Sequence, residues 1–110
     1  MIEQDIENSF TGYKDGLFCF DIKKNFIAFR GHFPQFPILP GIVEVEMIMF
    51  CIRKLLNNEQ IKLKEIIKIK FIKPIVPDSQ ILISIEENQN KINAIVKSET
   101  EVFAQARLKI

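Results

Sequence analysis

The fold of this chain is decided by residues 40–52, which read PGIVEVEMIMFCI. A proline followed by a glycine opens a helix here, and we expect that helix to run to about Leu56 or Asn57. Apart from Glu44 and Glu46, residues 42–52 are apolar on every side of such a helix. A helix that is apolar all round is typical of a buried element, and this run is too short to span a membrane.

Short strands and turns occupy most of the remaining sequence. Alternating apolar and polar residues predict strands over 5–13, 17–23, 61–73, 81–85, 92–96 and 102–108. Turns are predicted at 14–16, 88–90 and 98–101, the first of them from an Asp-Gly pair. Consecutive strands joined by short turns form an antiparallel sheet. We therefore predict one α+β domain over residues 1–110, with the sheet wrapped around one long central helix.

The strand predicted over 61–73 has a clear apolar face. Ile67, Ile69 and Phe71 alternate with Lys68 and Lys70. Because side chains alternate between the two faces of a strand, we expect the apolar set to face the core.

Composition and charge exclude several classes of function. The chain has 110 residues and a net charge of +1, from 15 basic and 14 acidic side chains. Proteins that bind nucleic acid usually carry a clear basic excess, so nucleic acid is not the expected partner. The polar N-terminus does not predict a signal peptide, and Cys19 and Cys51 lie in apolar runs that suit buried, reduced thiols. These features predict a cytoplasmic protein, and its small size predicts that dimerisation stabilises it.

Phenylalanine is the unusual residue of this composition. Ten phenylalanines accompany one tyrosine and no tryptophan. They form either an ordinary aromatic core or an apolar channel for an acyl chain, and composition does not separate the two.

The single histidine, His32, lies in a proline-rich loop over residues 31–41. Three prolines in this loop exclude regular helix and hold it in one shape. A lone histidine is often structural or exposed, but a rigid loop can also orient an imidazole that titrates near neutral pH. Gly41, at the start of the helix, lets a substrate approach free backbone N–H groups that can bind an oxyanion.

The two helix carboxylates cannot serve the same site within one chain. Glu44 and Glu46 are two positions apart, which is about 200° around a helix. Glu46 lies about 7.5 Å along the axis from Gly41, which keeps it close to the loop. We expect one carboxylate to face the chemistry and the other to reach solvent, a basic side chain or a subunit interface.

These residues resemble the signature of a known family. The GHFP stretch at 31–34, followed by Pro37, the Pro-Gly pair at 40–41 and Glu46, is similar to the hot-dog-fold 3-hydroxyacyl-[acyl-carrier-protein] dehydratases. Their signature has an acidic residue 14 positions after the histidine, and here that position is Glu46. Residues 71–78, FIKPIVPD, resemble the family's second motif. The short N-terminus resembles the compact branch of aryl-polyene-type thioester dehydratases.

The resemblance implies a role for each catalytic residue. His32 would remove the proton alpha to the thioester, the Gly41 N–H would bind the thioester oxygen, and Glu46 would help the β-hydroxyl leave as water. The product would be a trans-2-enoyl thioester. In the family the histidine and the acid meet across a dimer interface, so a homodimer or a higher even oligomer is implied.

The resemblance also implies the binding partners. The substrate would arrive on the phosphopantetheine arm of acyl carrier protein, without a metal or organic cofactor. Phe33, Phe36 and Ile42 are the expected contacts for the substrate. Basic residues near the loop are expected either to dock the acidic carrier protein or to form a solvated surface: Lys23, Lys24 and Arg30.

Two departures from the family leave alternatives open. Phe50 stands where the fatty-acid enzymes often carry a glutamine, and residues 77–79, PDS, lack the usual turn glycine. A hot-dog thioesterase and a non-catalytic partner subunit are the alternatives. The acyl chain length, the pathway and the choice between acyl carrier protein and coenzyme A as thioester carrier stay open.

Overall fold

The computed structural model describes residues 2–29 and 37–110, which form three helical segments and six strands. In chain order these are α1 (Ile2–Ser9), β1 (Phe10–Lys14), β2 (Leu17–Ile22), the 3-10 helix η1 (Ile27–Phe29), α2 (Gly41–Leu55), β3 (Glu65–Phe71), β4 (Ser79–Asn88), β5 (Lys91–Lys97) and β6 (Val102–Lys109).

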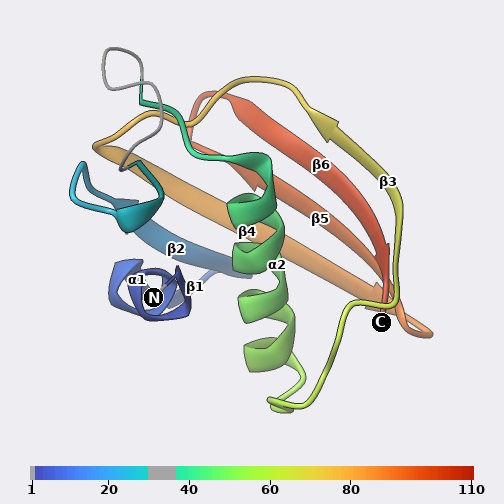
Figure 1. Ribbon diagram of the computed structural model, residues 1–110. Helices are drawn as coiled ribbons and strands as arrows, with labels where there is room; N and C mark the ends of the chain where they lie inside the picture. The colour runs from blue at the N-terminus through green and yellow to red at the C-terminus, as the bar shows by residue number, and fades with distance from the viewer. Residues whose placement is uncertain (1, 30–36) are drawn as a thin grey trace.

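The six strands form one antiparallel sheet in the order β1-β2-β4-β5-β6-β3. The sheet curves around α2, which lies across its concave face, and α1 lies beside the β1–β2 end (Figure 1). The predicted α+β architecture is therefore confirmed. The 15 residues of α2 begin at Gly41, as expected, and end at Leu55, within two residues of the predicted stop.

The core lies between α2 and the concave face of the sheet. The helix contributes residues with no exposed surface, among them Met47, Ile48 and Ile52, and the sheet contributes others such as Ile81 and Ile83. Each fully buried side chain of this size stabilises the fold by roughly 1.5–3 kcal/mol. Ile42 departs most from the predicted all-round burial, because 64% of it is exposed.

The two cysteines differ in burial. Cys51, on α2, has no exposed surface, and burial raises the pKa of its thiol above the ordinary value. Cys19, on β2, is half-buried, and both thiols are free.

The predicted hairpin turns are confirmed by the backbone. Asp15 and Gly16, between β1 and β2, have φ angles of 55° and 78°. Gln89 and Asn90, between β4 and β5, have φ angles of 52° and 68°. Two successive residues with positive φ match the right-handed twist of the flanking strands, and Asp, Asn and Gly adopt this conformation at low cost.

The strand predicted over 5–13 is wrong in its first half, because residues 2–9 form α1. Ile6 is buried on the inner face of this helix. The Asp5 carboxylate accepts a hydrogen bond from the Ile27 N–H of η1, and the Ser9 hydroxyl donates to the Asp5 carbonyl over 2.7 Å. The contact between Asp5 and Ile27 fixes α1 against a segment 22 residues away, which local alternation cannot reveal.

The strand predicted over 61–73 is shorter and less buried than expected. β3 begins at Glu65, and a bulge between Ile66 and Lys68 shifts its register against β6. Ile67 is consequently 40% exposed. Phe71 pairs with the buried Ala104 and so lies on the inner face, but 51% of it is exposed because β3 is the edge strand.

The contact between Asp5 and η1 predicts the effect of a substitution. Asp5→Ala removes a charge-assisted hydrogen bond and leaves the Ile27 N–H part-buried without its acceptor, which should lower the free energy of unfolding by about 1.5–3 kcal/mol. Urea denaturation measures this change. Glu7→Ala alters an exposed carboxylate of the same helix and should have a much smaller effect. Equal losses from the two variants would contradict the assigned contact.

Candidate active site

The start of α2 presents free hydrogen-bond donors. The Pro40 carbonyl accepts from Val43 N–H over 3.0 Å and from Glu44 N–H over 3.4 Å. Gly41 and Ile42 precede these residues, and their N–H groups have no acceptor within residues 2–29 and 37–110. The first N–H groups of a helix carry its positive dipole end, so they can stabilise developing negative charge. This placement suits the role predicted for Gly41.

Gly41 is also the point where β3 meets α2. A Cβ added at Gly41 would lie 2.5 Å from the Cζ of the Phe71 ring, and 2.9 Å from two further ring atoms. A larger residue therefore requires the ring to move. The two residues share a hollow, here called the Gly41 groove, which is lined by Ile38, Leu39, Gly41, Glu44, Phe71, Ile72, Lys73 and Pro74.

Glu44 supplies the carboxyl group of the Gly41 groove. It is only 4% exposed, and its Oε1 atom is buried without a hydrogen-bond partner in the described residues. Burial raises the pKa of Glu44 from 4.5 to about 7. A buried carboxyl without a partner is costly, because its charged form loses hydration and gains nothing in return.

Glu46 lies on another face of α2. It is half-buried and lines a hollow between α1 and α2 together with Glu3, Ile6, Glu7, Phe50, Arg53, Lys54 and Glu59. Gly41 and Glu46 are five positions apart, about 140° around the helix. The structure therefore does not bring these two predicted site residues together within one chain.

Phe50 belongs to an aromatic cluster beside this second hollow. Its ring centroid lies 5.3 Å from that of Phe10 and 5.8 Å from that of Phe20, both in edge-on geometry. The Lys54 Nζ lies 5.0 Å from the Phe50 centroid. Edge-on pairs stabilise a core beyond their buried area, so these three phenylalanines support the interpretation of an ordinary aromatic core.

The remaining predicted residues fall into two groups. His32, Phe33, Phe36 and Arg30 lie outside the described residues. Ile42 is exposed one turn before Glu46 on the same face of α2. Lys23 forms an exposed ion pair with Asp21 over 3.0 Å, and Lys24 is exposed, which supports the solvated-surface interpretation for both lysines.

The burial of Glu44 is the site feature that the sequence pattern does not reveal. We expected this carboxylate to reach solvent, a basic side chain or a subunit interface, and within one chain the first two are wrong. Its position three residues after Gly41 places both on one face of the helix, but this spacing does not show that the face is buried.

Comparison with known proteins identifies the family. The family model for ApeI-like proteins, described as ApeI dehydratase, matches residues 10–107. The chain belongs to the ApeI-like dehydratase family. The FabZ 3-hydroxyacyl-[acyl-carrier-protein] dehydratase of Aliivibrio fischeri is 31% identical, over 81% of this chain and 68% of its own length. The FabZ of Vibrio cholerae is 28% identical, over 90% of this chain and 75% of its own length.

Solved structures confirm the hot-dog fold of this ApeI-like chain. The dehydratase heterocomplex ApeI:P from Xenorhabdus doucetiae superimposes with a TM-score of 0.77 at 23% identity, covering 84% of this chain and 83% of the other. An uncharacterized protein from Erwinia carotovora subsp. atroseptica superimposes with a TM-score of 0.71 at 19% identity, covering 89% of this chain and 86% of the other. In the described part of the chain, no helix has the length and apolarity needed to cross a membrane.

The buried Glu44 predicts a pH-dependent stability. Because its pKa is about 7 in the folded state and 4.5 in its ordinary state, the folded chain holds a proton that the unfolded chain loses. The free energy of unfolding should therefore fall as pH rises from about 4.5 to 7, by roughly 3 kcal/mol in total. Glu44→Gln cannot titrate and should gain stability over the wild type by that amount between pH 4 and pH 8.

Urea denaturation across this pH range measures the gain. Glu99→Gln, at the exposed turn before β6, is the matched control and should show no such growth with pH. A stability difference between Glu44→Gln and wild type that is independent of pH would contradict the buried, protonated state of Glu44.

Proposed function

We propose that this chain dehydrates 3-hydroxyacyl thioesters carried on acyl carrier protein to trans-2-enoyl thioesters. The observation that carries the proposal is the register of the loop and helix: Gly41 is the first residue of α2, and Glu46, 14 residues after His32, lies on the same helix. The FabZ relatives, which are named for this reaction, support the choice of substrate.

The proposed elimination uses three groups of the protein. His32 takes the proton from the carbon alpha to the thioester, and the electron pair of that C–H bond moves onto the thioester oxygen. The Gly41 N–H stabilises the resulting enolate, as the free donors at the start of α2 permit. When the enolate collapses, the bond between the β-carbon and the hydroxyl breaks, and Glu46 supplies the proton that completes the departing water. This sequence needs no metal or organic cofactor.

Incubation with 3-hydroxyacyl-[acyl-carrier-protein] of several chain lengths tests the activity by mass spectrometry. We expect loss of one water by the wild type, and a loss of at least about a hundredfold in rate for His32→Ala and for Glu46→Gln, as is usual for a general acid or base. Glu99→Gln, which changes an exposed carboxylate, should keep the wild-type rate.

Two other results would each replace this function. Release of free thiol instead of water would indicate a thioesterase. A folded wild type that leaves every substrate unchanged would indicate a non-catalytic partner subunit.

A second copy of the chain completes the proposed site. β3 is an edge strand, and it and the segment after it expose several large apolar side chains: Ile66, Ile67, Phe71, Ile72 and Val76. An edge strand with apolar neighbours is a template for pairing with another strand. We propose that two copies pair along β3 and extend the sheet from one chain into the next.

The separation of Gly41 from Glu46 supports a site shared between two chains. Phe71 and Ile72, at the exposed β3 edge, also line the Gly41 groove, so a copy paired along β3 would border that groove. Glu46 of the same chain lines a different hollow. The Gly41 groove lies at the edge of the chain, and Glu46 lies on another face. This arrangement fits a dimer in which each active site takes its base from one copy and its acid from the other.

Sedimentation equilibrium tests the pairing. The wild type should be a dimer at micromolar concentration, and Ile67→Lys, which places a charge on the exposed apolar edge, should be largely monomeric and lose dehydratase activity. Tyr13→Lys, at an exposed position on the opposite edge strand β1, should stay dimeric. A monomeric wild type would contradict the homodimer and favour a different partner chain, as in the ApeI:P heterocomplex.

A further inference from the structure

Glu44 and the start of α2 converge on one groove. Gly41 and Glu44 are three positions apart, so they share a face of the helix. Helical side chains lean toward the N-terminus, which directs the Glu44 carboxyl back over the turn that begins at Gly41. Both residues line the Gly41 groove, where the Gly41 N–H has no acceptor within the described chain and Glu44 Oε1 has no partner.

We propose that Glu44 is a second hydrogen-bond donor to the thioester oxygen, beside the Gly41 N–H. The inference rests on the proposed dehydration of a thioester. It gives the groove two donors for one oxygen: a backbone N–H and the O–H of a neutral carboxylic acid. Two donors are the usual complement of an oxyanion site, and a carboxylic acid kept neutral in an apolar pocket can fill this role.

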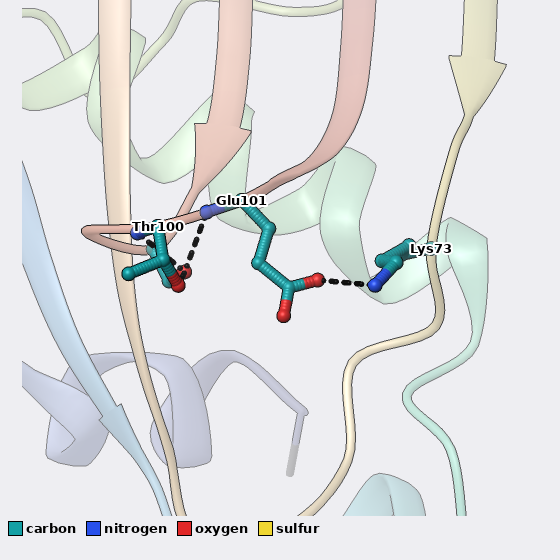
Figure 2. Close-up of polar contacts among 4 residues, drawn as sticks. Lys73, Thr100 and Glu101 are labelled. Carbon is teal, nitrogen blue, oxygen red and sulfur yellow. Dashed lines mark hydrogen bonds and ion pairs between the residues drawn. The ribbon is translucent and has the colours of Figure 1, made fainter.

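The surroundings of Glu44 keep its acid form. The groove is lined mainly by apolar side chains, and burial raises the pKa of Glu44 to about 7, with no neighbouring charge among the causes. The other charged side chain that lines the groove is Lys73, on the segment after β3. Its Nζ atom forms an ion pair with Glu101 Oε2 over 2.8 Å (Figure 2).

The backbone of Glu101 belongs to a hydrogen-bonded turn. The N–H groups of Thr100 and Glu101 donate to the Ser98 hydroxyl over 3.2 and 3.1 Å (Figure 2). Lys73 therefore has a partner of its own, and no ion pair joins it to Glu44 in the described residues. This leaves Glu44 free to donate its proton in a hydrogen bond to a bound group.

A purely structural role does not account for this carboxyl. A buried acid without a hydrogen-bond partner costs stability that an apolar residue of similar size would not cost. Strongly perturbed carboxyl groups that line a hollow are typical of functional sites. A substrate oxygen is the acceptor that would satisfy Glu44, since the described residues of the groove offer none.

Kinetics of two variants across pH 5.5–8.5 test the proposal, with 3-hydroxyacyl-[acyl-carrier-protein] as substrate. Glu44→Leu removes the donor and should lower kcat by about a hundredfold, with KM changed less than threefold, as for loss of one oxyanion donor. Glu44→Gln keeps an N–H donor and should stay within about fivefold of wild-type kcat. Because only the protonated Glu44 donates, wild-type kcat should fall above pH 7, and Glu44→Gln should lack this fall.

The outcomes separate this inference from the function on which it rests. Dehydration that is lost in Glu46→Gln but unchanged in Glu44→Leu would overturn the role of Glu44 alone. A wild type without dehydratase activity would overturn both. If Glu44→Leu does not fold, the pH profile decides: a fall above pH 7 that persists in Glu44→Gln overturns the proposal, and its loss supports it.

Discussion

The burial of α2 against the concave face of the sheet is the interaction on which the rest of this structure depends. The helix offers apolar side chains on nearly every side, and the inner faces of the sheet strands supply the matching surface. Once the helix is seated, the position of each of its residues follows from the geometry of 3.6 residues per turn. Gly41 meets β3 at the Phe71 ring, Glu44 turns inward, and Glu46 turns toward α1.

This packing assigns different environments to two carboxylates that look alike in sequence. The inward carboxyl loses water without gaining a partner among the described residues, whereas the outward one lies in a half-open hollow with other charged side chains. Small domains are stable by only about 5–15 kcal/mol. A buried acid in a core of this size therefore lowers the free energy of unfolding by a substantial fraction. Such a cost is understandable where the same group binds a ligand.

The architecture was predictable because its local signals agree with its tertiary structure. The Asp-Gly turn, the helix start at Gly41 and the alternating strands β4, β5 and β6 are each local patterns, and all of these are confirmed. The N-terminal helix was not predictable, because its position depends on the contact between Asp5 and Ile27. The burial of Glu44 was missed for another reason: a helix that is apolar on all sides does not reveal which side faces the sheet.

The sequence motif predicts which residues form the site, but not how they are arranged in space. Counting from His32 selects Glu46 over Glu44, but no count shows that Gly41 and Glu46 lie in different hollows of one chain. The bulge in β3 was not predictable either. Its one extra residue moves Ile67 out of the expected alternation of apolar and polar side chains. Each of these features depends on contacts between segments that are distant in sequence.

Because Cys51 is completely buried, the reactivity of its thiol can be used to measure how often the core opens. Its thiol lies at the interface between α2 and the sheet and, with its raised pKa, stays protonated and out of reach of a thiol reagent while the helix is seated. The rate at which a reagent labels Cys51 therefore measures how often the helix lifts from the sheet. Cys19, half-buried on β2, provides an internal reference for the reagent. The chain thus carries a natural probe of local unfolding that needs neither substrate nor an introduced label.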